Sequence, residues 1–225
     1  MKRHLVKINS IKQITPDVLQ FVTEKPQNYI FNPGQATEIS INKEDWKDEK
    51  RPFTFTCLPE KDYLEFTIKT YPSHKGVTNE LLKLKKGDEL FVHDVFGAIA
   101  YKGKGVFIAG GAGVTPFICI FRYLQSINEI GDNKLIFSNK TKDDIILAEE
   151  FEKLLGENFI NILSDPEYSG DEYAHGLITE GFLKNYISSS VKYIYLCGPP
   201  PMMAAIEKQL LSLGIDKRTI IQEDF

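Results

Sequence analysis

The hydrophobic pattern of this 225-residue chain changes at about residue 100, and this change limits the possible folds more than any other feature. Short β-type runs separated by turn residues fill the part before it. Continuous apolar runs alternating with amphipathic segments fill the part after it. The first pattern is typical of an antiparallel sheet, and the second of a doubly wound parallel α/β sheet. We therefore predict two domains, 1–100 and 101–225.

The first domain is predicted to be a small closed barrel. Residues 64–69 alternate strictly between apolar and polar, which predicts a strand with one buried face. One helix is expected over 76–84, with Thr78 as its N-cap. Six strands with one helix predict a six-stranded antiparallel β-barrel with a mouth for a ligand. The expected strands are 4–14, 18–22, 36–41, 53–57, 64–70 and 89–93.

The second domain is predicted to carry a glycine-rich turn directly after its first strand. Gly110-Gly111-Ala112-Gly113-Val114-Thr115-Pro116 lies between strand 106–109 and helix 117–126, with Pro116 in the first helical turn. A strand, a glycine-rich turn and a helix N-terminus form the geometry that holds a dinucleotide pyrophosphate. A tight turn without a ligand is the alternative, since Gly-x-Gly-x-x-Gly is absent. Further strands are expected at 134–138, 159–164, 193–197 and 220–223, and further helices at 147–155, 179–186 and 201–213.

Two other segments combine chemically useful residues. In Arg51-Pro52-Phe53-Thr54, alternation along a strand puts Arg51 and Phe53 on one face, suited to a phosphate and a flat ring. A barrel strand with an Arg at its mouth is the alternative. In Cys197-Gly198-Pro199-Pro200-Pro201-Met202-Met203, three prolines impose a stiff turn between a strand and a helix. A cysteine that is merely small and buried is the alternative there.

Composition excludes several classes of partner. The net charge of −4 gives no basic footprint for nucleic acid, and no apolar run approaches the roughly 20 residues of a membrane span. The three cysteines, Cys57, Cys119 and Cys197, are far apart and match no disulfide framework, zinc site or iron–sulfur spacing. We expect a cytoplasmic protein with no metal, nucleic-acid or membrane partner.

Taken in order, these motifs resemble the ferredoxin/flavodoxin–NADP⁺ reductase superfamily. The similarity rests on the arginine motif at 51–54, Val77-Thr78-Asn79, the glycine-rich turn, the cysteine–proline motif and the terminal Glu223-Asp224-Phe225, so it spans essentially the whole chain. The chain departs from the family at two places. Phe53 stands where most members carry Tyr, and the family's helix-opening Gly falls on Lys75, with Gly76 one place later.

The resemblance implies an FAD domain followed by an NAD(P) domain, with the following residues at the cofactors. The FAD residues would be Arg51, Pro52, Phe53, Thr54, Lys75, Gly76, Val77, Thr78 and Phe225. The NAD(P) residues would be Gly110, Gly111, Gly113, Val114, Thr115, Pro116, Ser138, Asn139, Lys140, Lys142, Cys197, Gly198, Pro199 and Met202. Four residues would be catalytic: Thr54 and Glu223 near flavin N5, Cys197 beside nicotinamide C4, and Phe225 over the flavin face.

The resemblance also implies a reaction, in which hydride passes from NADPH or NADH to FAD. Because the cysteines provide no iron–sulfur relay, single electrons would then pass to a separate acceptor such as ferredoxin or flavodoxin. Free flavin or a ferric chelate is another acceptor, and a non-catalytic flavin-binding sensor or assembly module is the rival reading. The hydroxyls and cations of 138–142 favour NADPH, whereas Asp143 and Asp144 oppose its phosphate. A monomer is expected, although the sequence leaves the oligomeric state open.

Overall fold

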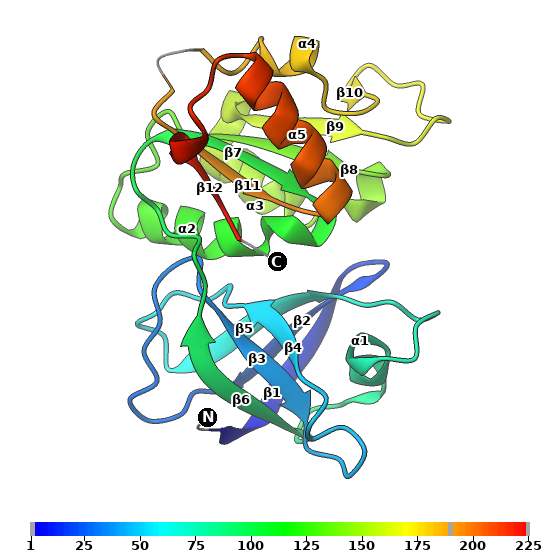
Figure 1. The fold of residues 1–225 in the computed structure, drawn as a ribbon. Coiled ribbons are helices and arrows are strands. Elements are labelled where there is room, and N and C mark those ends of the chain that lie inside the picture. Colours follow the sequence, from blue (N-terminus) through cyan, green and yellow to red (C-terminus); the bar gives the residue numbers. More distant parts are fainter. Residues whose placement is uncertain (1–2, 189–190, 224–225) are drawn as a thin grey trace. The chain divides into compact units, whose positions relative to one another are not determined.

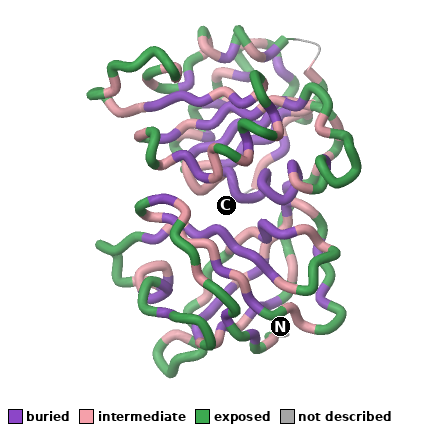
Figure 2. The backbone as a smooth tube through the Cα atoms, turned by 180° about the vertical axis from the view of Figure 1, so that it is seen from behind, coloured by how far each residue is buried: buried purple, intermediate pink, exposed green. Residues whose placement is uncertain are grey.

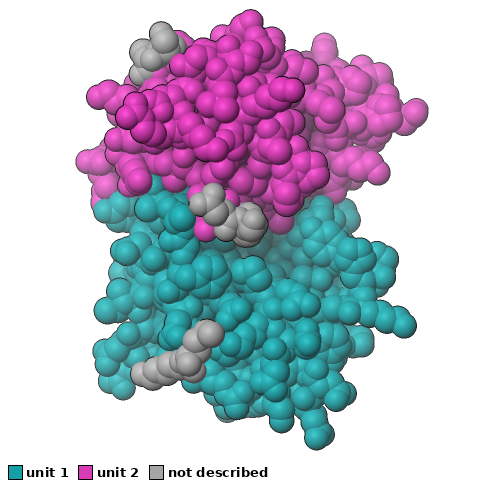
Figure 3. All heavy atoms as spheres, in the orientation of Figure 1, with its two compact units in different colours: residues 1–100, 115–123 teal, residues 101–114, 124–225 magenta. Residues whose placement is uncertain are grey.

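The computed structural model describes residues 3–188 and 191–223, and the chain divides into two compact units (Figures 1 and 3). The first unit contains the residues up to 100 together with 115–123. The second contains 101–114 and the residues from 124 onward. The helical segment 115–123 therefore clusters with the first hundred residues, although it follows the first strand of the second sheet.

The first unit is built on a six-stranded sheet in the order β4-β3-β6-β1-β2-β5, and every neighbouring pair is antiparallel. The predicted antiparallel sheet is thus confirmed. Phe55, the residue after β4, forms an isolated antiparallel bridge with Phe66 of β5, and closure of the sheet into a barrel stays a prediction. The strands are β1 (His4–Thr15), β2 (Val18–Glu24), β3 (Ala36–Ile41), β4 (Arg51–Thr54), β5 (Tyr63–Lys69) and β6 (Glu89–Phe96).

Strand β5 is buried on both faces, so the prediction of one buried face was wrong. Phe66 lies in the apolar core of the unit, but Glu65 and Thr67 on the opposite face are also only 8% and 4% exposed. The reason is helix α2 (Thr115–Ser126), from which Arg122 donates a hydrogen bond of 2.6 Å to Glu65 Oε1. A polar face that water would normally cover is therefore covered by a helix that comes later in the chain.

The predicted helix over 76–84 is shorter, and its cap is a different residue. Helix α1 (Val77–Glu80) continues only as the 3₁₀ helix η1 (Leu81–Lys83). Gly76 is the N-cap, and its carbonyl accepts hydrogen bonds from the N–H groups of Asn79 and Glu80. Thr78 lies inside the helix, so its assignment as N-cap was wrong. Gly76 has an extended backbone and Val77 is the first helical residue, so the helix begins one residue before Thr78.

The second unit is built on a parallel sheet in the order β10-β9-β8-β7-β11-β12, which confirms the doubly wound class. Helix α5 crosses one face of this sheet (Figure 1), and Phe151 of α3 packs on the opposite face against Phe137 and Phe159. The strands are β7 (Gly105–Gly110), β8 (Lys134–Asn139), β9 (Phe159–Leu163), β10 (Ala174–His175), β11 (Tyr193–Cys197) and β12 (Ile220–Gln222); the helices are α3 (Ala148–Leu155), α4 (Glu180–Leu183) and α5 (Pro200–Ser212).

The central strands of this sheet, β7, β8 and β11, are almost continuously buried (Figure 2), as their uninterrupted apolar sequences predict. Strand β10 was not predicted, because its two residues pair only with Ile162 and Leu163 and carry no strand pattern of their own. Throughout the part of the chain that the structure describes, we find no helix with the length and apolar character needed to cross a bilayer.

Candidate functional site

The glycine-rich turn joins β7 to α2 as predicted. Gly110 ends the strand, residues Gly111–Val114 form a 3₁₀ turn, and α2 begins at Thr115 with Pro116 in its first turn. Gly111 adopts φ +50°, a left-handed conformation that favours glycine, and the space where its Cβ would stand is open. The turn therefore presents bare backbone beside open space, which fits a pyrophosphate.

The cysteine–proline motif packs directly against this turn. The register of β7 and β11 places Ala109 beside Cys197, so both loops leave the carboxyl edge of the sheet together. A Cβ on Gly113 would collide with the carbonyl of Cys197, and a Cβ on Gly110 would collide with Met202. Two motifs far apart in sequence thus pack together and form one cradle, in which the Cys197 backbone requires glycine at position 113.

Cys197 and Glu223 are brought together at neighbouring strand ends. Leu196 on β11 pairs with Gln222 on β12, so the residue after each lies at the same edge. Burial, and to a smaller extent the Glu223 carboxylate, raises the pKa of the Cys197 thiol to about 12. The thiol is therefore neutral near pH 7, which suits a small polarisable contact and excludes a thiolate nucleophile there.

The end of strand β8 presents a mixed group of predicted nucleotide residues. Ser138 is half-buried, Lys140 is exposed, and the side chain of Asn139 is buried with neither amide atom hydrogen-bonded in the structure. Buried polar groups are normally satisfied, so this amide has capacity for a bound group. Lys142 is already engaged, since its Nζ lies 2.8 Å from Glu172 Oε2 and 5.4 Å from the centroid of the Tyr173 ring.

In the first unit, strand β4 presents the arginine motif at its surface. Arg51 is exposed, and its guanidinium donates to the Lys50 carbonyl at 2.6 Å and lies 3.5 Å from Glu49. Phe53 is half-buried, with part of its ring packed on the apolar core. Pro52 is exposed, and Thr54 is half-buried. An accessible cation and a partly exposed ring therefore occur on alternate positions of one strand.

The helix α1 region supplies the other predicted flavin residues. Lys75 is exposed, Gly76 and Thr78 are half-buried, and Val77 belongs to the apolar core. A Cβ built on Gly76 would meet no atom within 4 Å, so open space adjoins the backbone where the helix starts. The side chain of Val77 faces the core, which leaves only its backbone for a ligand. Phe225 lies outside the described residues.

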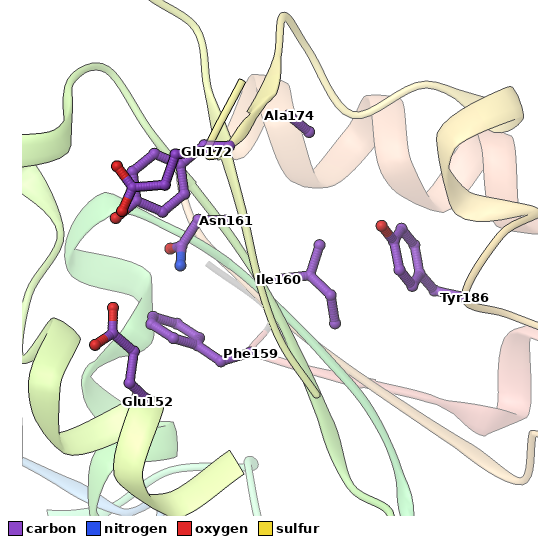
Figure 4. A pocket seen from close by; sticks show the side chains of 8 residues that line it. Glu152, Phe159, Ile160, Asn161, Glu172, Ala174 and Tyr186 are labelled. Carbon is purple, nitrogen blue, oxygen red and sulfur yellow. The ribbon is translucent and has the colours of Figure 1, made fainter. Parts of the chain in front are cut away.

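A separate hollow of about 290 Å³ lies at the outer edge of the parallel sheet and contains none of the predicted site residues (Figure 4). Its lining includes two carboxylates and three aromatic rings. Among the described residues, no group of three or more His, Cys, Asp and Glu side chains could hold a metal ion. The lining residues of the hollow are Glu152, Phe159, Ile160, Asn161, Glu172, Tyr173, Ala174 and Tyr186.

An antiparallel unit with an accessible arginine, joined to a parallel sheet with a glycine cradle, defines a flavin- and dinucleotide-binding reductase class. Comparisons with known families agree with it. Residues 3–101 match the family described as FAD-binding domain, and residues 107–208 match the oxidoreductase NAD-binding domain. The chain belongs to the ferredoxin reductase-like superfamily of FAD-binding oxidoreductases, with FAD and NAD(P)H as its cofactor and substrate.

Individual proteins support the same family. NADH-cytochrome b5 reductase 1 of Neosartorya fischeri is 34% identical over 220 residues, which cover 89% of this chain and 70% of the relative. The glycine betaine monooxygenase reductase subunit of Pseudomonas aeruginosa is 30% identical over 99% of this chain and 64% of its own length. The ferredoxin NADP⁺ reductase of Neisseria gonorrhoeae shares the fold, with a TM-score of 0.85 at 19% identity, and 99% and 98% of the two chains are covered.

Proposed function

We propose that this chain takes hydride from NADH onto FAD and passes single electrons to a separate acceptor protein. The observation that carries the proposal is the cradle formed where the glycine-rich turn meets the cysteine–proline loop. FAD, when bound, supplies the conversion of a two-electron hydride into one-electron steps. The protein contributes binding and orientation: Arg51 for the pyrophosphate, Thr54 for a hydrogen bond at the flavin ring, and a neutral Cys197 for the nicotinamide.

We propose NADH over NADPH because of the charges beside strand β8. The sequence pattern favoured NADPH through Lys140 and Lys142, but the Lys142 ammonium is paired with Glu172. Glu172 would also repel the 2′-phosphate of NADPH if the ribose lies at this strand end. The side chain of Thr141 holds Asp144 in a capping box, which keeps another carboxylate at this edge. The Neosartorya relative is named as an NADH-dependent reductase.

The coenzyme proposal is tested with Glu172→Gln. We expect kcat/KM for NADPH to rise about two- to fivefold with little change for NADH, because an exposed ion pair contributes roughly 0.2–1 kcal/mol. Glu167→Gln, an exposed neutralisation in the same loop, is the control and should leave both values unchanged. A wild-type protein that uses NADPH better than NADH would refute the proposal.

The acceptor is proposed to be a small one-electron carrier protein. Three cysteines are too few for the four thiolate ligands that an iron–sulfur cluster usually takes, so this chain has no relay of that kind. The relatives' names point to a cytochrome b5 or a monooxygenase component, and these stand beside the ferredoxin or flavodoxin expected from the sequence. Reoxidation of the reduced protein by a panel of these carriers, free flavin and ferric chelates would rank them.

The proposed function is tested by adding NADH to the purified yellow protein in the absence of oxygen. We expect the flavin absorbance near 450 nm to bleach within seconds, on the order of ordinary turnover rates. A protein that stays yellow with both NADH and NADPH would instead be a flavin-binding sensor or assembly module. Phe53 and Lys75, where this chain departs from the family pattern, are the residues that favour a non-catalytic flavin-binding module.

A further inference from the structure

A buried polar cluster in the first unit joins helix α2 to strand β5 and to the segment that follows strand β4. We call Thr56, Glu65, Thr67 and Arg122 the Arg122 cluster. The side chains of Glu65 and Arg122 are only 10% and 20% exposed, and Arg122 Nη1 lies 2.6 Å from Glu65 Oε1. Thr56 donates to the same carboxylate oxygen at 2.8 Å, and Thr67 donates to Thr56 at 3.3 Å. The carboxylate is thus held from two directions.

Helix α2 also holds the backbone that follows the arginine motif. Arg122 donates to the Thr56 carbonyl at 2.7 Å, and the Cys119 thiol donates to the next carbonyl, that of Cys57, at 3.0 Å. Cys119 and Arg122 are three positions apart, so they share one face of the helix. Two donors on that face therefore bind two successive carbonyls. This backbone begins two residues after Thr54, the proposed flavin contact.

The same helix begins at the glycine-rich turn. Val114, the last residue of the turn, directly precedes Thr115, the first residue of α2. Arg122 lies seven residues further on, which is about two turns and roughly 10 Å along the axis, on nearly the same face as Thr115. An anchor at Arg122 therefore limits both the rotation and the axial shift of the helix start.

A buried ion pair is a poor device for stability alone. Desolvation of two charges offsets much of their attraction, and apolar side chains of similar volume often stabilise a fold equally well. Directional hydrogen bonds, however, hold a helix and a strand in one relative position, whereas apolar packing allows several positions. The guanidinium of Arg122 binds a carboxylate and a carbonyl at once, so its geometry allows little sliding of α2 along the strand.

We propose that Arg122 and Glu65 are positioning residues for hydride transfer. They keep the start of α2 at a constant separation from the Thr54 segment, acting through Thr56 and the helix. This inference rests on the proposed function, since it concerns the delivery of hydride to FAD. Reaction rates fall steeply when bound groups are misplaced, by about 10²-fold for 1 Å. The cluster should therefore affect the rate of flavin reduction more than the binding of either cofactor.

The test compares Arg122→Met, Arg122→Lys and Glu65→Gln with wild type in FAD content, KM for NADH and the anaerobic rate of flavin bleaching at saturating NADH. We expect Arg122→Met to keep its FAD and its KM within about twofold, while the bleaching rate falls about tenfold or more. Arg122→Lys should recover part of the rate. In the double variant Glu65→Gln/Arg122→Met, the bleaching rate should fall little further than in the single variants, because the two residues act as one unit.

Lys69→Met is the matched control. It breaks another ion pair of strand β5, in which Lys69 Nζ lies 2.8 Å from Asp17, and this pair does not involve α2. We expect its bleaching rate to equal that of wild type. An Arg122→Met protein with less FAD or lower thermal stability, but an unchanged rate per bound flavin, would show a purely structural role and overturn the inference.

Hydrogen exchange of the α2 amides gives a second readout that needs no reaction. Arg122→Met, or Arg122→Lys if the Met variant does not fold, should exchange faster at 115–126 and 54–57, and Lys69→Met should not. Unchanged exchange at these residues would overturn the inference even if no coenzyme bleaches the flavin. A wild-type protein that never bleaches, with faster exchange in the variant, would contradict the proposed function and leave the anchoring of α2 established.

Discussion

Arg51 is the residue whose surroundings say most about ligand binding. Its guanidinium is accessible, and the contacts that hold it are the neighbouring Lys50 carbonyl and the Glu49 carboxylate, both at the surface. Exposed contacts of this kind contribute little to stability. A phosphate could therefore replace Glu49 at small cost, and a two-pronged charged contact would then be gained.

We expect Arg51→Ala to weaken FAD binding by about 10- to 100-fold, because a charged hydrogen-bonded contact contributes roughly 1.5–3 kcal/mol. The thermal unfolding midpoint of the FAD-free protein should barely move. Equilibrium dialysis of FAD and a thermal scan of the apoprotein measure the two effects. Arg218→Ala, which removes an exposed arginine paired with Asp216 in the other unit, is the control. Equal FAD affinity in both variants would remove Arg51 from the phosphate role.

At the scale of elements, glycine occurs just before helix α1, at Gly76, and just before helix α2, at Gly113, for different physical reasons. Gly113 is required by packing, because its Cβ would collide with the Cys197 carbonyl. Gly76 has an extended backbone and open space around its Cβ position, so nothing inside the protein requires glycine there. A requirement at Gly76 would have to come from a ligand that lies close to the backbone.

Gly76→Ala separates these explanations. We expect the stability of the folded protein without FAD to change by less than about 1 kcal/mol, because alanine restricts the unfolded chain but is a poorer N-cap than glycine. FAD should bind several-fold more weakly if the pyrophosphate approaches the start of α1. Gly113→Ala, in contrast, should destabilise the second unit whether or not a cofactor is present. If Gly76→Ala binds FAD as tightly as wild type, the backbone at Gly76 does not contact the cofactor.

At the scale of the whole molecule, three buried thiols should make the free energy of unfolding decrease at alkaline pH. Burial raises the pKa of Cys57 to about 11 and those of Cys119 and Cys197 to about 12, from an ordinary value of 9.0. Above pH 9 the unfolded chain loses these protons while the folded chain keeps them. Deprotonation therefore favours unfolding, and the stabilisation that is complete below pH 9 is lost progressively as the pH rises to 11–12.

We expect the free energy of unfolding to fall by about 1.4 kcal/mol per buried thiol between pH 8 and pH 10, since one unit of pKa difference corresponds to roughly 1.36 kcal/mol. Urea unfolding at the two pH values measures this. Cys57 and Cys119 belong to the first unit and Cys197 to the second, so Cys197→Ala should reduce the loss only in the second. The same urea midpoints at pH 8 and pH 10 would contradict the burial of these thiols.

Much of the fold could be predicted from local patterns. Strand β3, strand β11 and the turn before α2 lie where the sequence places them, because apolar runs, glycines and prolines act on the backbone within a few residues. The family and its cofactors could likewise be predicted, since several motifs occur in a fixed order along the chain. The assignments of individual residues to FAD and NAD(P) remain predictions.

Other features depend on segments that are distant in sequence, and only the tertiary structure decided them. Alternation in β5 could not show that its polar face is buried, because the covering residue, Arg122, lies on a helix more than fifty positions later. The pairing of Lys142 with Glu172 likewise depends on a remote loop, and it changed the expected coenzyme. Sequence periodicity reports which side chains share a face, whereas burial and ion pairing depend on what the rest of the chain places against that face.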